Sequence, residues 1–111
     1  MPMLDAIKTA LDATGIAFAM YGWATAPRTD YGVISLESAG AYVSGDDHMQ
    51  MHAVEGTVDL YCHNAGETQR KAVQTALNSI DGLSWYFNST QYEADTRLVH
   101  FEWVFQFAET I

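Results

Sequence analysis

The first stretch of the chain repeats its apolar residues at the spacing of an amphipathic helix. Between residues 2 and 14, one stripe is formed by Leu4, Ile7 and Leu11. Apolar residues at i, i+3 and i+7 lie on one side of a helix, and Gly15 follows where such a helix would end. The pattern therefore predicts an N-terminal helix with one buried face.

A second helix is predicted further along, after a polar stretch. Asn64 and Glu67, three residues apart, resemble a helix N-terminus capped by the asparagine. The stripe that follows consists of Val73, Ala76, Leu77 and Ile80. Asp81 and Gly82 are placed to end this helix.

Five other stretches are typical of β-strands, because apolar and polar residues alternate or aromatic and β-branched residues gather there. They are residues 16–24, residues 31–38 with a continuation through Tyr42 and Val43, residues 54–62, residues 83–89 and residues 97–108. The segment TAPRTD is expected to form a loop between the first two, and residues 44–47 a turn after the second.

The third of these strands has the clearest alternation. One side carries Val54, Val58, Leu60 and Cys62, and the other carries Glu55, Thr57, Asp59 and His63. One face is therefore expected in the core and the other in water or against a neighbouring molecule. Gly56, on the inward side, predicts a bulge or the close approach of a helix.

The last strand carries an aromatic row that needs a covering layer. Its inward residues are Val99, Phe101, Trp103, Phe105 and Phe107, opposite His100, Glu102 and Gln106. So large an apolar row predicts a strand inside the sheet, beneath helices. The fold class expected for residues 1–111 is a single α+β domain, with two helices packed on one face of a mostly antiparallel sheet.

Charge and cysteine content narrow the functional classes. The chain has 111 residues and a formal net charge of −9, from 14 acidic and 5 basic side chains, which disfavours tight binding of nucleic-acid phosphates. A single cysteine, Cys62, excludes an intramolecular disulfide and a Cys-based zinc site. The N-terminus lacks the features of a signal peptide, and no apolar run approaches the ~20 residues of a membrane span. We expect a soluble protein made in the cytoplasm, with no membrane association.

Candidate metal and catalytic residues are few. His48 and His52 have the spacing of two ligands on a helix, but their segment, DDHMQMHAVEG, resembles a loop leading into a strand, where they would lie roughly 13 Å apart. Asp46 and Asp47 lack the remaining ligands of a calcium loop and predict a plain acidic turn. No metal or cofactor is expected.

Two further side chains could take part in catalysis. Cys62 is interpreted as a small core residue because it lies on the apolar side of its strand. His100 and Glu102 share a strand face and could form an acid–base pair, although cross-strand contacts or a subunit interface explain them equally. Since no phosphate-binding loop or nucleophile motif is present, we expect a protein that is not an enzyme.

The arrangement of these segments resembles that of small tail terminator, or tail completion, proteins of long-tailed bacteriophages and prophages. The resemblance rests on the strand YGVISLES after an Ala-Pro, the turn from Tyr42 to Asp47, VEGTVDLYC directly before an amphipathic helix, and the aromatic strand LVHFEWVFQFAE. It covers nearly the whole chain and consists of order and residue type.

The resemblance implies a structural virion protein at the head–tail junction. It implies a ring, commonly a hexamer in that family, which caps the last ring of tail-tube protein, ends tail polymerisation and joins the tail to head-completion, or stopper, proteins. DNA would pass through the lumen without specific binding, and an acidic lumen would let it slide.

An assembly interface is expected on the projecting turn and on the polar side of the third strand. Its residues are Asp46, Asp47, His48, Met49, Met51, Glu55, Asp59 and Tyr61. Methionine suits adaptable contacts, and a tyrosine among polar residues suits a partner surface. Two alternatives stay open: a head-closure or other neck protein, and a small ferredoxin-like enzyme or ligand-binding domain.

Overall fold

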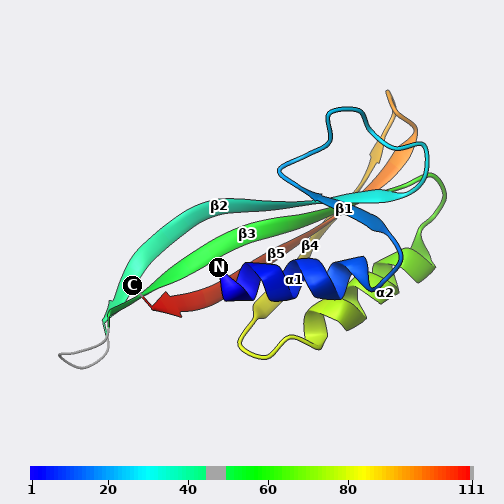
Figure 1. The fold of residues 1–111 in the computed structure, drawn as a ribbon. Helices are drawn as coiled ribbons and strands as arrows, with labels where there is room; N and C mark the ends of the chain where they lie inside the picture. The colour runs from blue at the N-terminus through cyan, green and yellow to red at the C-terminus, as the bar shows by residue number, and fades with distance from the viewer. Residues whose placement is uncertain (45–49, 111) are drawn as a thin grey trace.

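A computed structural model describes the backbone of residues 1–44 and 50–110 and the side chains of residues 1–37 and 51–109. Along the chain, the elements follow the order helix, two strands, a third strand, helix, two strands (Figure 1). They are α1 (Pro2–Asp12), β1 (Ala17–Met20), β2 (Tyr31–Ser44), β3 (Gln50–Cys62), α2 (Glu67–Asn78), β4 (Ser84–Glu93) and β5 (Leu98–Thr110).

The five strands form one sheet in the order β1-β2-β3-β5-β4. β1 runs parallel to β2, and every other neighbouring pair is antiparallel. The prediction of a mostly antiparallel sheet is confirmed. β5 lies between β3 and β4, so the prediction that the aromatic strand is internal is also confirmed.

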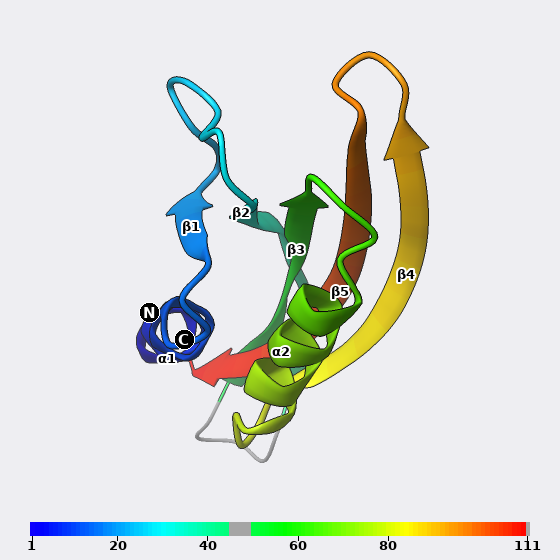
Figure 2. The same cartoon turned by 90° about the vertical axis from the view of Figure 1, so that its right-hand side faces the viewer.

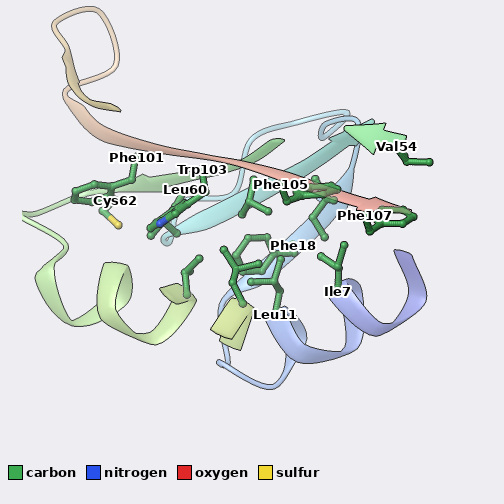
Figure 3. Close-up of a cluster of buried hydrophobic side chains, with 14 residues drawn as sticks. Ile7, Leu11, Phe18, Val54, Leu60, Cys62, Phe101, Trp103, Phe105 and Phe107 are labelled. Carbon is green, nitrogen blue, oxygen red and sulfur yellow. The ribbon is translucent and has the colours of Figure 1, made fainter. Parts of the chain in front are cut away.

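Both helices cover the same face of the sheet, and the other face stays open (Figure 2). The α+β fold with helices on one face is therefore as the sequence predicts. Between the layers lies one cluster of buried side chains (Figure 3). It consists of Ile7, Leu11, Phe18, Ile34, Val54, Val58, Leu60, Cys62, Val73, Leu77, Phe101, Trp103, Phe105 and Phe107.

The predicted helix stripes supply the helical part of this core. Ile7 and Leu11 of α1 and Val73 and Leu77 of α2 are fully buried. Trp103 of β5 is buried as well, and its indole Nε1 donates a hydrogen bond to Gln74 Oε1 at 3.3 Å. The one polar atom of this large side chain is thus satisfied inside the core.

The first and fourth strands differ in length from their predictions. β1 ends at Met20 and not at Ala24, because Tyr21 and Gly22 have φ values of 64° and 142° and turn the chain out of the extended conformation. β4 continues to Glu93, four residues beyond the predicted end, because it stays paired with β5 past a bulge between Phe87 and Ser89.

The start of α2 was predicted too early. The helix begins at Glu67, after Gly66 in the left-handed conformation with φ 72°. Asn64 Oδ1 accepts a hydrogen bond from the Gly66 N–H at 2.9 Å, so the asparagine stabilises the turn before the helix and does not cap it. The helix also ends earlier than predicted, at Asn78, and Gly82 with φ 82° redirects the chain four residues later.

Gly56 marks a close approach, but the neighbour is a strand and not a helix. A Cβ atom at this position would overlap the ring of Phe105 on β5 and the backbone oxygen of Ser35 on β2. The bulge expected at Gly56 lies on the neighbouring strand: on β2, Leu36 faces Gly56 and Ser38 faces Glu55, which leaves Glu37 as an extra residue.

In the part of the chain that the structure describes, neither helix is long and apolar enough to span a membrane.

Candidate functional site

The fold leaves one face of the sheet uncovered (Figure 2), and its side chains form cross-strand rows. The register places four residues in each row, one from each of β2, β3, β5 and β4. The rows are Tyr31, Tyr61, His100 and Gln91, then Val33, Asp59, Glu102 and Ser89, then Ser35, Thr57, Val104 and Tyr86.

Three rings of the first row stack on one another. The ring centroids of Tyr31 and Tyr61 are 4.9 Å apart, and those of Tyr61 and His100 are 4.3 Å apart, with interplanar angles of 16° in both pairs. Trp23 meets Tyr31 edge-on at 6.5 Å, and its Nε1 donates a hydrogen bond to the Gly32 oxygen at 3.1 Å. These contacts make a continuous aromatic surface across three strands.

His100 lies between two carboxylates at the end of this stack. Its Nε2 is 2.6 Å from Asp59 Oδ1, and its Nδ1 is 3.9 Å from Glu93 Oε2. The hydrogen bond with Asp59 raises the pKa of His100, and the negative charges of Asp59, Glu93 and Glu102 add to that effect, while burial opposes it. With a carboxylate facing each ring nitrogen, the arrangement favours a charged imidazolium that binds the strands together.

The two tyrosines of the row stay protonated at physiological pH. Burial, with the nearby charge of Asp59, raises the pKa of Tyr61 to about 12. Burial and Glu93 raise the pKa of Tyr31 in the same direction. Both phenols are therefore neutral and can act as hydrogen-bond donors or as aromatic contact surfaces.

The open face carries acids but no lysine or arginine. Its carboxylates are Glu37, Glu55, Asp59, Glu93 and Glu102, and Thr57 Oγ1 donates to both Glu37 and Asp59. The five cationic side chains of the sequence are Lys8 on α1, Arg70 and Lys71 on α2, Arg28 in the loop before β2 and Arg97 in the β4–β5 turn. The electrostatic character of the open face is thus set by carboxylates and by His100.

The structure brings part of the predicted interface together. Glu55, Asp59 and Tyr61 alternate along β3 and lie on the open face, as the sequence predicts. Met51 was expected in the projecting loop, but it is a residue of β3 on that same face, because the strand begins at Gln50. Asp46, Asp47, His48 and Met49 lie outside the described residues. A role in assembly for any of them stays a prediction.

His52 corrects the expectation of a loop. β3 begins at Gln50, so His52 is a strand residue paired opposite Glu109, and its Nε2 lies 3.4 Å from Glu109 Oε2. The pairing with β5 extends the strand toward its N-terminus, although no core residue marks that part in the sequence. Among the described residues, no three His, Cys, Asp or Glu side chains come together in a way that could hold a metal ion.

His100 and Glu102 share the open face, but each forms its hydrogen bond with another residue. His100 bonds with Asp59 of β3, and Glu102 accepts a hydrogen bond from the Asn88 side chain on β4. Both contacts are of the cross-strand kind that the sequence left open. Cys62 is a core residue as predicted, and burial, with a contribution from Asp30, raises the pKa of its thiol to about 12.

Asp30 is a residue whose importance the sequence did not indicate. Its Oδ1 accepts a hydrogen bond from the His63 backbone N–H at 2.9 Å and contacts His63 Nδ1 at 3.2 Å. Its Oδ2 accepts a hydrogen bond from Gln69 Nε2 at 2.9 Å. One aspartate at the start of β2 thus ties the end of β3 to α2, and the only sequence signal was its place at the end of a loop.

The sequence matches no protein-family model, and a search of curated proteins finds no match. Solved structures do match by fold. The chain is similar to a chain in the structure of the virion of a native gene transfer agent (GTA) particle, with a TM-score of 0.61 and 16% sequence identity. The similarity covers 96% of this chain and 93% of that one, so the two share nearly the whole α+β fold.

Proposed function

We propose that this chain is a structural subunit of a phage-like virion, in which it forms a ring, a hexamer in the family it resembles, at the head–tail junction. The ring would cap the tail tube, end its polymerisation and bind the head-completion proteins. The observation that carries the proposal is the fold shared over 96% of the chain with a chain of a gene transfer agent virion.

The uncovered surfaces support a protein that works by contact. β4 is an edge strand of ten residues, and its Tyr86 and Tyr92 are 57% and 66% exposed. Long edge strands with exposed aromatic residues pair readily with other chains unless they are blocked. In this proposal, β4 and the open face, with Met51, Glu55, Asp59 and Tyr61, contact neighbouring subunits or line the channel.

The charge of the open face suits a channel for DNA. Its carboxylates would repel phosphates, and no lysine or arginine lies there to hold them. We propose Asp46 and Asp47 as further residues of the assembly interface. His100 would act in holding the strands together and not as a base, because both of its ring nitrogens face carboxylates.

Electron microscopy of the purified chain, alone and mixed with its tail-tube protein, tests this function. We expect rings of uniform diameter that sit on tube ends. Deletion of the chain from its phage should give overlong or headless tails, and supplying the wild-type chain should restore normal virions. Normal virions after deletion would overturn the proposal.

The same mixture separates the alternatives. Rings that bind only the head-side connector, and leave tube length unchanged, would favour a head-closure protein. A chain that stays monomeric with every tail and neck component and co-purifies with a small molecule would favour a ligand-binding domain or enzyme.

A further inference from the structure

A hollow of about 380 Å³ lies on the open side of the sheet, at the edge formed by β1 and β2. Its aromatic walls come from Tyr21, Trp23, Tyr31 and Tyr61, and the Asp59 carboxylate belongs to its lining. The loop that carries Tyr21 and Trp23 rises from the open side of the sheet (Figure 1). The hydrogen bond of Trp23 to the Gly32 oxygen fixes one wall in place.

This lining is the chemistry that binds a guanidinium or ammonium group. Aromatic faces attract a cation through their quadrupoles. Asp59 pairs with His100 through Oδ1 and accepts from Thr57 through Oδ2, so it adds a hydrogen-bond acceptor to the hollow and not an unpaired charge. The chain's own cations do not fill the hollow, because none of its five lysines and arginines is among the lining residues. A cation that occupies this hollow would therefore come from another molecule.

A suitable cation lies at the opposite edge of the same sheet. Arg97 is exposed in the turn between β4 and β5, and its backbone N–H bonds to the Glu93 oxygen at 2.7 Å. It forms no salt bridge with the residues that the structure describes. Arg97 is thus an exposed cation on a tight turn, accessible to another molecule.

Tyr21 and Arg97 also share an uncommon backbone conformation. They are the two non-glycine residues with positive φ in the described chain, at 64° and 59°. Glycine or asparagine would adopt this conformation at lower cost, and strained residues of this kind gather at functional sites. One of them lies in the wall of the hollow and the other is the candidate occupant.

The hollow and Arg97 lie at the same end of the strands. The loop with Tyr21 leads into Tyr31, and Tyr31 shares a cross-strand row with Tyr61, His100 and Gln91, just before the turn with Arg97. Figure 2 shows this loop and this turn at the same height, on opposite flanks of the sheet. A head-to-tail contact in a ring requires two different surfaces on opposite sides of each subunit, as the hollow and the turn with Arg97 are.

We infer that Arg97 of one copy enters the hollow of Tyr21, Trp23, Tyr31 and Asp59 on the next copy, and that this contact repeats around the ring. The inference rests on the proposed function as an assembly subunit and names the residues that join its copies. Its occupant is a second copy of this chain.

Two substitutions test the contact without damaging the fold. Arg97→Gly removes the cation and Tyr21→Gly removes one wall, and both replace a strained residue by the one that tolerates its φ. We expect thermal midpoints at or above that of the wild type, and self-association weakened roughly 10- to 100-fold in sedimentation equilibrium. Lys71→Ala, which removes an exposed positive charge from α2, is the matched control and should leave association unchanged.

Mixing the two variants gives a sharper result. In an equimolar mixture, Arg97 of the Tyr21→Gly copy can still enter the intact hollow of the Arg97→Gly copy. We therefore expect mixed pairs in native mass spectrometry that neither variant forms alone at the same concentration. Absence of such pairs, or wild-type association constants for both single variants, would overturn the inference.

The two proposals fail in different ways. If wild-type rings form and cap tubes while Arg97→Gly and Tyr21→Gly behave like the wild type, the contact is wrong and the assembly function stands. If the wild-type chain stays monomeric with all tail and neck components, the proposed function falls and the contact with it.

Discussion

The two faces of the sheet consist of the same strands, but different interactions stabilise them. On β5, Trp103 is fully buried beneath the helices, while its neighbour Val104 points to the open face and is partly exposed. The covered face is held by apolar burial, and the open face by stacked rings and a charged hydrogen bond. Burial under the helices therefore stabilises the fold, and the open face is free to carry contacts with other molecules.

Substitutions at two adjacent residues of β5, one on each face, should show the largest difference in the free energy of unfolding. Trp103→Ala removes the largest buried side chain and leaves Gln74 without its indole partner. We expect a loss of about 3–5 kcal/mol in the free energy of unfolding, measured by urea denaturation.

Val104→Ala is the matched control for that experiment, because it shortens a side chain one residue away on the open face. We expect a loss of about 1 kcal/mol or less, since little buried surface is removed. Equal losses for the two variants would contradict the distinction between the faces.

A smaller loss of stability should follow from adding one methyl group to the covered face. In Gly56→Ala, the new Cβ meets the Phe105 ring and the Ser35 oxygen. We expect a loss of about 1–3 kcal/mol in urea denaturation, because a close-packed core must shift to accept it.

Gly56→Ala combined with Phe105→Leu supplies the control. The smaller leucine gives room on one side, so the double variant should lose less stability than the sum of the two single losses. Additive losses would show that the ring of Phe105 is not the obstacle.

The smallest loss of stability should come from a substitution on the open face, and this loss should depend on pH. The pKa of His100 is raised in the folded state, so its contribution is complete below the unfolded pKa of about 6.5 and is lost as pH rises through the folded pKa. Asp59→Asn should therefore lower stability by about 1–2 kcal/mol at pH 5.5 and by less at pH 9. NMR titration should show a lower pKa for His100 in the variant.

Glu55→Gln removes an equal charge from the same face, where Glu55 bonds Gln106 and does not contact His100. This variant should leave the pH profile of stability unchanged. A flattened profile in Glu55→Gln would mean that general charge, and not the contact with Asp59, sets the behaviour of His100.

The sequence predicts the helices and strands well where one side of the element is buried, because apolar residues then recur at a regular spacing. The row from Phe101 to Phe107 and the stripe of Val73 and Leu77 mark covered surfaces, because a side chain under a helix layer must be apolar. The ends of the strands have no such pattern. Tyr21 stops β1 by a left-handed φ, and Gln50 starts β3 through pairing alone, and neither cause has a compositional signal.

The candidate site was harder to predict because it depends on register. Asp59 and His100 are 41 residues apart in sequence, and only the pairing of Tyr61 with His100 places them side by side. Sequence alternation assigned Glu55, Asp59 and Tyr61 to the correct face. It could not show that Tyr31 and Trp23 extend the aromatic row.

The strand order also affects when each part of the sheet can form during synthesis on the ribosome. β3, in the middle of the sheet, pairs on one side with β2, which precedes it directly, and on the other side with β5, which ends at Thr110. During synthesis, the β2–β3 hairpin can form early, while the second edge of β3 stays unpaired until β5 emerges. Completion of the domain, and so competence to join other copies, therefore has to wait for β5, which is synthesised after every other strand of the sheet.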